Sequence, residues 1–253
     1  MALLALASCG RPQEQRPAWR AEAEQQCLRS GQLRLSPSIR QMPPLNPGGY
    51  CGADYPLRVE GFDRLNIRMS RGVAMNCQMA VATERWLAEV VQPAAMREFG
   101  SPVTQVDTYG TYSCRRINNS RRGSMSEHSF ANAIDVSGFR LADGRRVQVG
   151  RPMRNPLLPS PWRFQEERSL GVALEDGGLD LLSIGPGIDG AQPPDINFGA
   201  SDAQGFWRAA RNGACDGFAT VLGPGSDAAH ADHLHLDLAR RLPRSGQRRS
   251  VCR

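Results

Sequence analysis

All four histidines of the chain lie in two short stretches, SEHSFANAID at residues 126–135 and HADHLHLDL at residues 230–238. They are His128, His230, His233 and His235. Zinc prefers nitrogen, oxygen or sulfur ligands, and a catalytic zinc site takes three from the protein and leaves a fourth position for water. His128, Asp135 and one histidine of HLH make such a set, so the clustering predicts a metal site.

The stretch HLHLDL alternates between polar and apolar residues, as a half-buried strand does. Successive side chains of a strand point to opposite faces, so Leu234, Leu236 and Leu238 should anchor it in the core. His233 and His235 then face a common space. One of them can bind the metal while the other contacts water or substrate.

Residues 133–149 are predicted to form two strands joined by a tight turn. In the first of these strands Ile134 and Val136 point inward. The carboxylate of Asp135 therefore points out of the core, toward the same site.

Helical periodicity over residues 75–100 predicts a core helix that ends at Gly100, with Pro93 as a kink or restart. Residues 103–113 are rich in β-forming types, and residues 205–218 suit a second helix. Together, these helices and strands predict an α+β fold with a mainly antiparallel sheet and flanking helices.

The segment 151–201 is rich in proline and glycine and shows no clear periodicity. We expect it to be an insertion that flanks or covers the site. Apart from it, residues 27–253 are expected to form one domain, which we expect to be monomeric.

The net charge of +6 comes from arginines that are scattered along the chain without a nucleic-acid recognition motif. A solvated basic surface, or a weak attraction to anionic cell-wall polymer, explains them. No run reaches the roughly 18 apolar residues of a membrane-spanning helix. We therefore expect no nucleic-acid partner and no transmembrane segment.

The N-terminal MALLALASCG resembles a bacterial lipobox, in which the cysteine, here Cys9, becomes the lipidated first residue. The stretch lacks a positive region and is shorter than a complete signal peptide, so the true start codon would lie upstream. We expect an exported periplasmic lipoprotein whose only membrane contact is the lipid, with residues 1–26 as a signal remnant and polar tether. The alternative is a frayed terminus with an accidental cysteine.

Six further cysteines are dispersed without a CxxC pair, which indicates disulfides in an oxidising compartment rather than a cysteine zinc site. Six cysteines allow 15 connectivities. Proximity along the chain suggests Cys27 with Cys51, Cys77 with Cys114, and Cys215 with Cys252.

The pattern S-x-H-x(6)-D followed by H-x-H is similar to the metal-binding pattern shared by lysostaphin-like endopeptidases, D-Ala-D-Ala carboxypeptidases and the hedgehog fold. The segments YSCRRINN, SEHSFANAIDVSGFRLADGR and VLGPGSDAAHADHLHLDL resemble the bacterial extensin-like C-terminal domain. This resemblance implies a D-Ala-D-Ala carboxypeptidase/hedgehog-like fold, which the expected disulfides would stabilise. It also implies a one-zinc peptidase acting on peptidoglycan, as a D,D-carboxypeptidase or endopeptidase.

Carried over by motif, the resemblance makes His128, Asp135 and His235 the zinc ligands. Arg115 would bind a substrate carbonyl or carboxylate and stabilise the oxyanion, and Ser126 would contact the substrate or support a ligand. The chain departs from the motif at Ala131, where glycine is usual, which affects the expected turn.

The general base has two candidates. Related carboxypeptidases use a carboxylate three residues before the last zinc histidine, here Asp232. Strand alternation places Asp232 on the face opposite His235 and favours His233, unless the strand entry is irregular. His230 is expected to orient a ligand.

The alternative function is a non-catalytic, zinc-containing cell-wall-binding module.

Overall fold

The computed structural model describes residues 15–150, 200–240 and 251–253. Cys9 and nearly all of the expected insertion at 151–201 lie outside these ranges. In the part of the chain that is described, no helix is long and apolar enough to cross a membrane.

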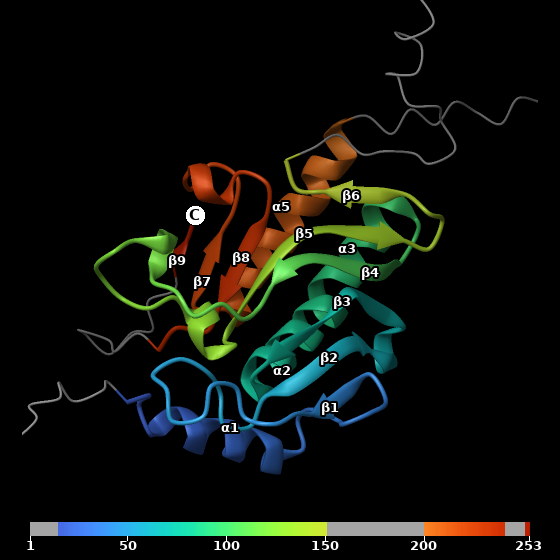
Figure 1. Ribbon diagram of the computed structural model, residues 1–253. Helices are drawn as coiled ribbons and strands as arrows, with labels where there is room; N and C mark the ends of the chain where they lie inside the picture. Colours follow the sequence, from blue (N-terminus) through green and yellow to red (C-terminus); the bar gives the residue numbers. More distant parts are fainter. Residues whose placement is uncertain (1–14, 151–199, 241–250) are drawn as a thin grey trace, which may run out of the picture.

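The described strands form one mixed, mostly antiparallel sheet in the order β1-β2-β3-β4-β5-β8-β7-β9, with β6 pairing with β5 (Figure 1). Only the pairs β3 with β4 and β7 with β9 are parallel among them. The α+β class and the mainly antiparallel sheet are thus confirmed. The strands are β1 (Ile39–Gln41), β2 (Leu57–Phe62), β3 (Ile67–Met75), β4 (Val103–Gly110), β5 (Ala133–Leu141), β6 (Arg146–Gln148), β7 (Thr220–Leu222), β8 (Leu234–Asp237) and β9 (Val251–Cys252).

The predicted core helix is confirmed as α2 (Cys77–Trp86), a π turn η2 (Leu87–Val91) and α3 (Gln92–Phe99). The Asn76 side chain caps its start by accepting a hydrogen bond from the Met79 N–H, and Gly100 ends it with a left-handed φ of 63°. Pro93 falls in the first turn of α3. A missing N–H is tolerated there, so the proline restarts the helix rather than ending it.

The core lies between the sheet and the layer formed by α2, α3 and α5 (Ala200–Gly217) (Figure 1). Phe139 of β5 packs against Trp86 and Phe206, and the Trp86 indole donates a hydrogen bond to the Ala210 carbonyl. Each buried side chain of this size stabilises the fold by about 1.5–3 kcal/mol. This packing makes β5 a rigid support for the residues on its other face.

The expected polar tether is wrong for residues 19–26, which form the first two turns of α1 (Trp19–Ser30). Arg20 is buried and makes two hydrogen bonds to the Glu127 carboxylate, at 2.8 and 3.0 Å, while its guanidinium stacks on Phe130. Hydrophobic periodicity missed α1 because the helix is polar and is held by an ion pair and a disulfide.

Three disulfides are present, as predicted, but two of the expected pairings are wrong. Cys27 bonds to Cys77 and Cys51 bonds to Cys114, while Cys215 bonds to Cys252 as expected. Proximity along the chain failed because α1 packs on α2 and brings Cys27 to the start of α2. Such disulfides are typical of proteins that fold outside the cytoplasm.

Candidate metal centre

Three side chains converge at the end of β5 and β8, and we call His128, Asp135 and His235 the ligand group. The His235 Nδ1 is 2.9 Å and the His128 Nε2 is 3.1 Å from the Asp135 Oδ1, and the two ring nitrogens are 3.2 Å apart. All three residues are buried. Together they can hold a metal ion.

The register of β5 and β8 creates half of this group. Asp135 pairs directly with His235, so their side chains share one face of the sheet. The neighbouring pairs, Ile134 with Leu236 and Val136 with Leu234, fill the core on the other face. The alternation predicted from HLHLDL is therefore confirmed for β8.

His128 arrives from the short 3₁₀ helix η4 (Glu127–Phe130). The Ser126 hydroxyl caps this helix by accepting a hydrogen bond from the His128 N–H. Ala131 ends it with a left-handed φ of 50°. Alanine therefore adopts the left-handed turn for which glycine was expected. A residue other than glycine is strained in that conformation.

Each imidazole of the ligand group is fixed through its other ring nitrogen. The His128 Nδ1 lies 3.2 Å from the Thr111 carbonyl oxygen, and the His235 Nε2 lies 3.0 Å from the Asp237 carboxylate. A carbonyl oxygen can only accept, so the His128 Nδ1 carries a proton, and the Nε2 is the nitrogen that faces Asp135 and can bind a metal ion. Partners of this kind orient metal-binding histidines and fix their tautomers.

The electrostatics of the ligand group favour an anionic Asp135. Burial alone would raise the pKa of Asp135, but hydrogen bonds from His128 and His235 hold it well below its usual value. Burial would lower the pKa of His235, but the carboxylates of Asp135 and Asp237 raise it to about 9. The pocket between these side chains therefore stabilises positive charge next to Asp135.

The donor set fits zinc. Two imidazole nitrogens and one carboxylate oxygen match the three protein ligands of a catalytic zinc site. Ligand atoms about 2.0–2.2 Å from a tetrahedral zinc ion lie roughly 3.3–3.5 Å apart. The spacings of 2.9, 3.1 and 3.2 Å are close to this value, so small side-chain shifts suffice to admit the ion.

A second set, which we call the rim group, consists of Tyr109, Asp232 and His233. The His233 Nδ1 is 3.0 Å from the Asp232 Oδ1, and its Nε2 is 3.7 Å from the Asp135 Oδ1. The Tyr109 hydroxyl donates to the Asp232 Oδ2 at 2.9 Å. The rim group therefore connects the ligand group to the protein surface.

Asp232 lies before the strand, because β8 begins at Leu234. Strand alternation therefore does not place Asp232 on the opposite face, and both Asp232 and His233 lie on the side of the ligand group. Hydrogen bonds from His233 and Tyr109 hold the pKa of Asp232 below its usual value. The side chain is half exposed, so it is an accessible carboxylate.

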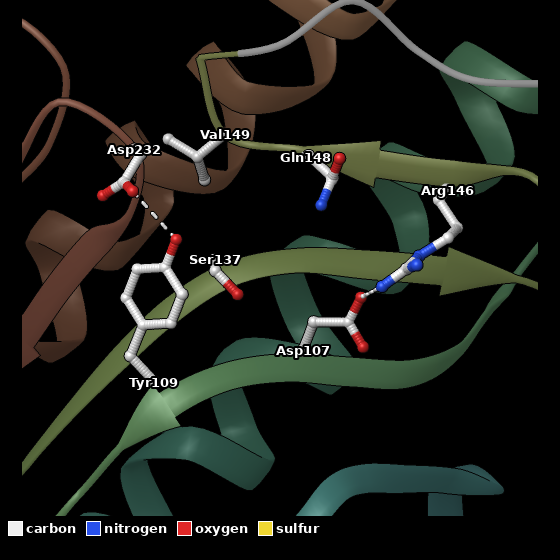
Figure 2. Close-up of a pocket in the computed structure, with 7 residues that line it drawn as sticks. All are labelled: Asp107, Tyr109, Ser137, Arg146, Gln148, Val149 and Asp232. Atoms are coloured by element: carbon white, nitrogen blue, oxygen red, sulfur yellow. Dashed lines mark hydrogen bonds and ion pairs between the residues drawn. The ribbon is translucent and has the colours of Figure 1, made fainter. Parts of the chain in front are cut away.

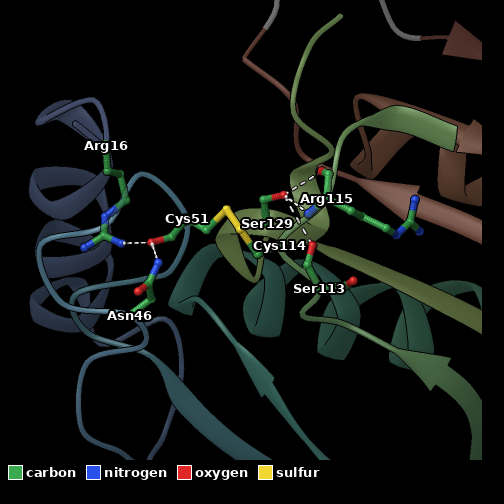
Figure 3. The surroundings of a disulfide bond; sticks show 7 residues. All are labelled: Arg16, Asn46, Cys51, Ser113, Cys114, Arg115 and Ser129. Carbon is green, nitrogen blue, oxygen red and sulfur yellow. Dashed lines mark hydrogen bonds between the residues drawn. A yellow bond between two sulfur atoms is a disulfide. The ribbon is translucent and has the colours of Figure 1, made fainter. Parts of the chain in front are cut away.

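The remaining predicted residues lie around this site. The His230 Nδ1 bonds to Asp227 at 2.7 Å, and its ring packs against His233 and His235. Arg115 is half-buried, and Figure 3 shows its side chain pointing away from the Cys51–Cys114 bond. The described residues give its guanidinium no hydrogen bond or ion pair.

The backbone next to Arg115 is fixed. The Arg115 N–H donates to the Ser129 hydroxyl, which in turn donates to the Arg115 carbonyl (Figure 3). Cys114, the residue before it, is bonded to Cys51. The position of the Arg115 main chain thus follows from η4 and from the disulfide.

Sequence reasoning assigned no role to three residues that support the site: Thr111, Asp237 and Tyr109. Asp237 carried a signal, because it follows His235 by two residues in an alternating strand and shares its face. Thr111 acts through its carbonyl and Tyr109 comes from a distant strand. The neighbouring residues in the sequence therefore do not indicate the role of either residue.

The family model described as Extensin-like protein C-terminus matches residues 25–165 and 194–253 of the chain. The residues between these two parts, 166–193, lie inside the segment that the sequence indicated as an insertion. No curated protein and no solved structure matches the chain.

Proposed function

The chain belongs to the extensin-like protein C-terminus family, and we propose that it is a zinc-dependent hydrolase of peptide bonds in bacterial peptidoglycan, of the D,D-carboxypeptidase or endopeptidase type. One observation carries the proposal. A buried set of three zinc-type ligands adjoins an accessible carboxylate, Asp232, through His233. The sequence resemblance to D-Ala-D-Ala carboxypeptidase/hedgehog-like zinc peptidases supports the substrate class.

A zinc ion bound by the ligand group would supply Lewis acidity toward water and the scissile carbonyl. Asp232 accepts the proton that water loses as its oxygen bonds to the carbonyl carbon. Asp232 then passes that proton to the leaving nitrogen as the carbon–nitrogen bond breaks. Arg115 stabilises the negative charge on the carbonyl oxygen, provided that its half-buried side chain turns toward the site.

Asp232 suits the role of proton acceptor better than His233. His233 lies between two carboxylates, with its Nδ1 near Asp232 and its Nε2 near Asp135. The Nδ1 donates to Asp232 and cannot accept a proton, so only the Nε2, 3.7 Å from Asp135, could do so. The His233 side chain is only 11% exposed, whereas that of Asp232 is 51% exposed and more accessible to water. We assign His233 to holding Asp232, Ser126 to positioning His128, and His230 to supporting His235 by packing against its ring.

The alternative is a non-catalytic module in which zinc only stabilises the fold and the surface binds cell wall. A structural zinc site usually has four protein ligands. The described residues bring together three, which favours catalysis.

We further propose a monomer, exported to the periplasm and anchored only by a lipid on Cys9.

The decisive experiment is digestion of purified peptidoglycan by the zinc-loaded protein, with the products identified by mass spectrometry. We expect release of an amino acid or of uncrosslinked peptides, abolished by His128→Ala. If zinc is bound but peptidoglycan of several chemotypes yields no product, the binding module becomes the better interpretation.

A further inference from the structure

A pocket of about 250 Å³ adjoins the rim group at a junction in the sheet (Figure 2). One edge of β5 is shared by two strands, because β8 pairs with residues 133–136 and β6 pairs with residues 138–140. Ser137 lies between the two pairings and lines the pocket. Asp232 and Tyr109 line the end nearest the ligand group.

At its other end the pocket is lined by an arginine that is held in place. Arg146 of β6 reaches across β5 to the Asp107 carboxylate of β4, with an Nη2 to Oδ2 distance of 2.8 Å (Figure 2). Asp107 is buried and its other oxygen accepts a hydrogen bond from Gln105. Both oxygens of Asp107 are therefore engaged, while 45% of the Arg146 side chain stays exposed.

This arrangement presents guanidinium N–H groups to the pocket. Guanidinium offers five N–H donors in a planar fork that matches a carboxylate, and the bond to Asp107 uses only Nη2. Gln148, on the same strand, extends its amide into the same space (Figure 2). The volume is below the roughly 300 Å³ of pockets for drug-sized ligands, so a short peptide end fits better than a polymer strand.

We propose that this pocket binds the free carboxylate of the substrate on the leaving-group side of the cleaved bond, with Arg146 as the carboxylate-binding residue. The inference rests on the proposed hydrolase function and specifies its substrate class. Such a substrate has its carboxylate at Arg146 and its scissile nitrogen near Asp232.

The length of the pocket limits how far the carboxylate lies from the cleaved bond. Asp107 pairs with Gly138, three residues beyond the ligand Asp135 on β5, which is roughly 10 Å of strand. An extended peptide covers about 3.3–3.6 Å per residue. The carboxylate is therefore no more than about three residues from the cleaved bond.

The test measures binding, so that it does not depend on turnover. The zinc-loaded full chain is titrated calorimetrically with acetyl-D-alanyl-D-alanine and with the same peptide as its carboxamide. We expect the carboxylate form to bind wild type roughly 10- to 100-fold more tightly, because only this form makes a charged hydrogen bond with Arg146. Arg146→Gln should remove this preference, and Arg146→Lys should keep part of it.

Arg40→Gln is the matched control. Arg40 is also an exposed, carboxylate-paired arginine of the same sheet, but it lies on β1 at the far edge and pairs with Glu60. This variant should keep the full preference.

Equal binding of both peptides to wild type, or no binding of either, would overturn the inference, even if peptidoglycan is hydrolysed. A carboxylate preference that survives Arg146→Gln would also overturn it. If the preference depends on Arg146 but peptidoglycan digestion yields no product, the pocket stands and the proposed hydrolase function fails.

Discussion

The ligand group and the rim group lie side by side but are built differently. The ligand group is buried, and its two histidines are held from behind by the Thr111 carbonyl and the Asp237 carboxylate. In the rim group, Tyr109 and the Asp232 side chain are each 51% exposed. The rim side chains bond mainly to one another.

The difference matches two separate tasks. Metal affinity needs ligands that are already oriented and dehydrated, because their freedom would otherwise be lost on binding. A residue that exchanges protons with a substrate must instead be reachable from solvent. We therefore expect changes in the ligand group to alter metal content, and changes in the rim group to alter turnover alone.

The largest effect should follow removal of a ligand. We expect His128→Ala and His235→Ala to lose nearly all bound zinc, measured by elemental analysis of the purified proteins, because two ligands hold the ion too weakly. His230→Ala is the comparison: its ring packs on His235 but it supplies no ligand atom, so this variant should keep most of its zinc. Full zinc occupancy in both ligand variants would contradict the assignment.

Loss of a supporting carboxylate should come next. We expect Asp237→Ala to weaken zinc binding by about 10- to 100-fold, measured by competition with a chelator, because His235 loses the partner that orients it. Asp227→Ala removes the same kind of partner from His230, which supplies no ligand atom, and should weaken zinc binding much less. Equal affinities in the two variants would show that orientation by Asp237 is unimportant.

A change in the rim group should spare the metal. Asp232→Asn should keep zinc and fold while turnover falls by about 10²- to 10⁴-fold, the usual range for loss of a general base. His233→Ala should be the milder lesion. Zinc content and the rate of product release are measured on the same preparations, and the reverse order would transfer the role of base to His233.

The smallest effect should be that of Tyr109→Phe on the acidity of Asp232. The hydrogen bond from Tyr109 stabilises the carboxylate, so its loss should raise the pKa of Asp232 toward the ordinary value. Because its pKa is lower in the folded than in the unfolded protein, ionised Asp232 stabilises the folded state at pH values above its ordinary pKa. That contribution disappears as the pH falls through the lowered pKa. A carboxyl carbon-13 titration of wild type and variant measures the shift, and an unchanged pKa would refute the role of Tyr109.

Local patterns predicted most of the elements that carry the site. The capped helix beginning at Cys77, the paired strands β5 and β6, and the alternation of β8 were all readable, because side-chain period and capping depend on neighbours within a few residues. α1 escaped prediction because its polar surface has no such period. Its position depends on Glu127, more than a hundred residues away.

The sequence by itself determined which donor atoms are available and, for Asp135 and His235, which face of its strand each occupies, because residue type and strand alternation are local properties. The tertiary structure alone decided that Asp135 lies opposite His235, that Cys27 bonds to Cys77, and that Asp232 meets Tyr109. These contacts join segments 50 or more residues apart in the chain, and their geometry follows from how the sheet and helices pack rather than from any local pattern.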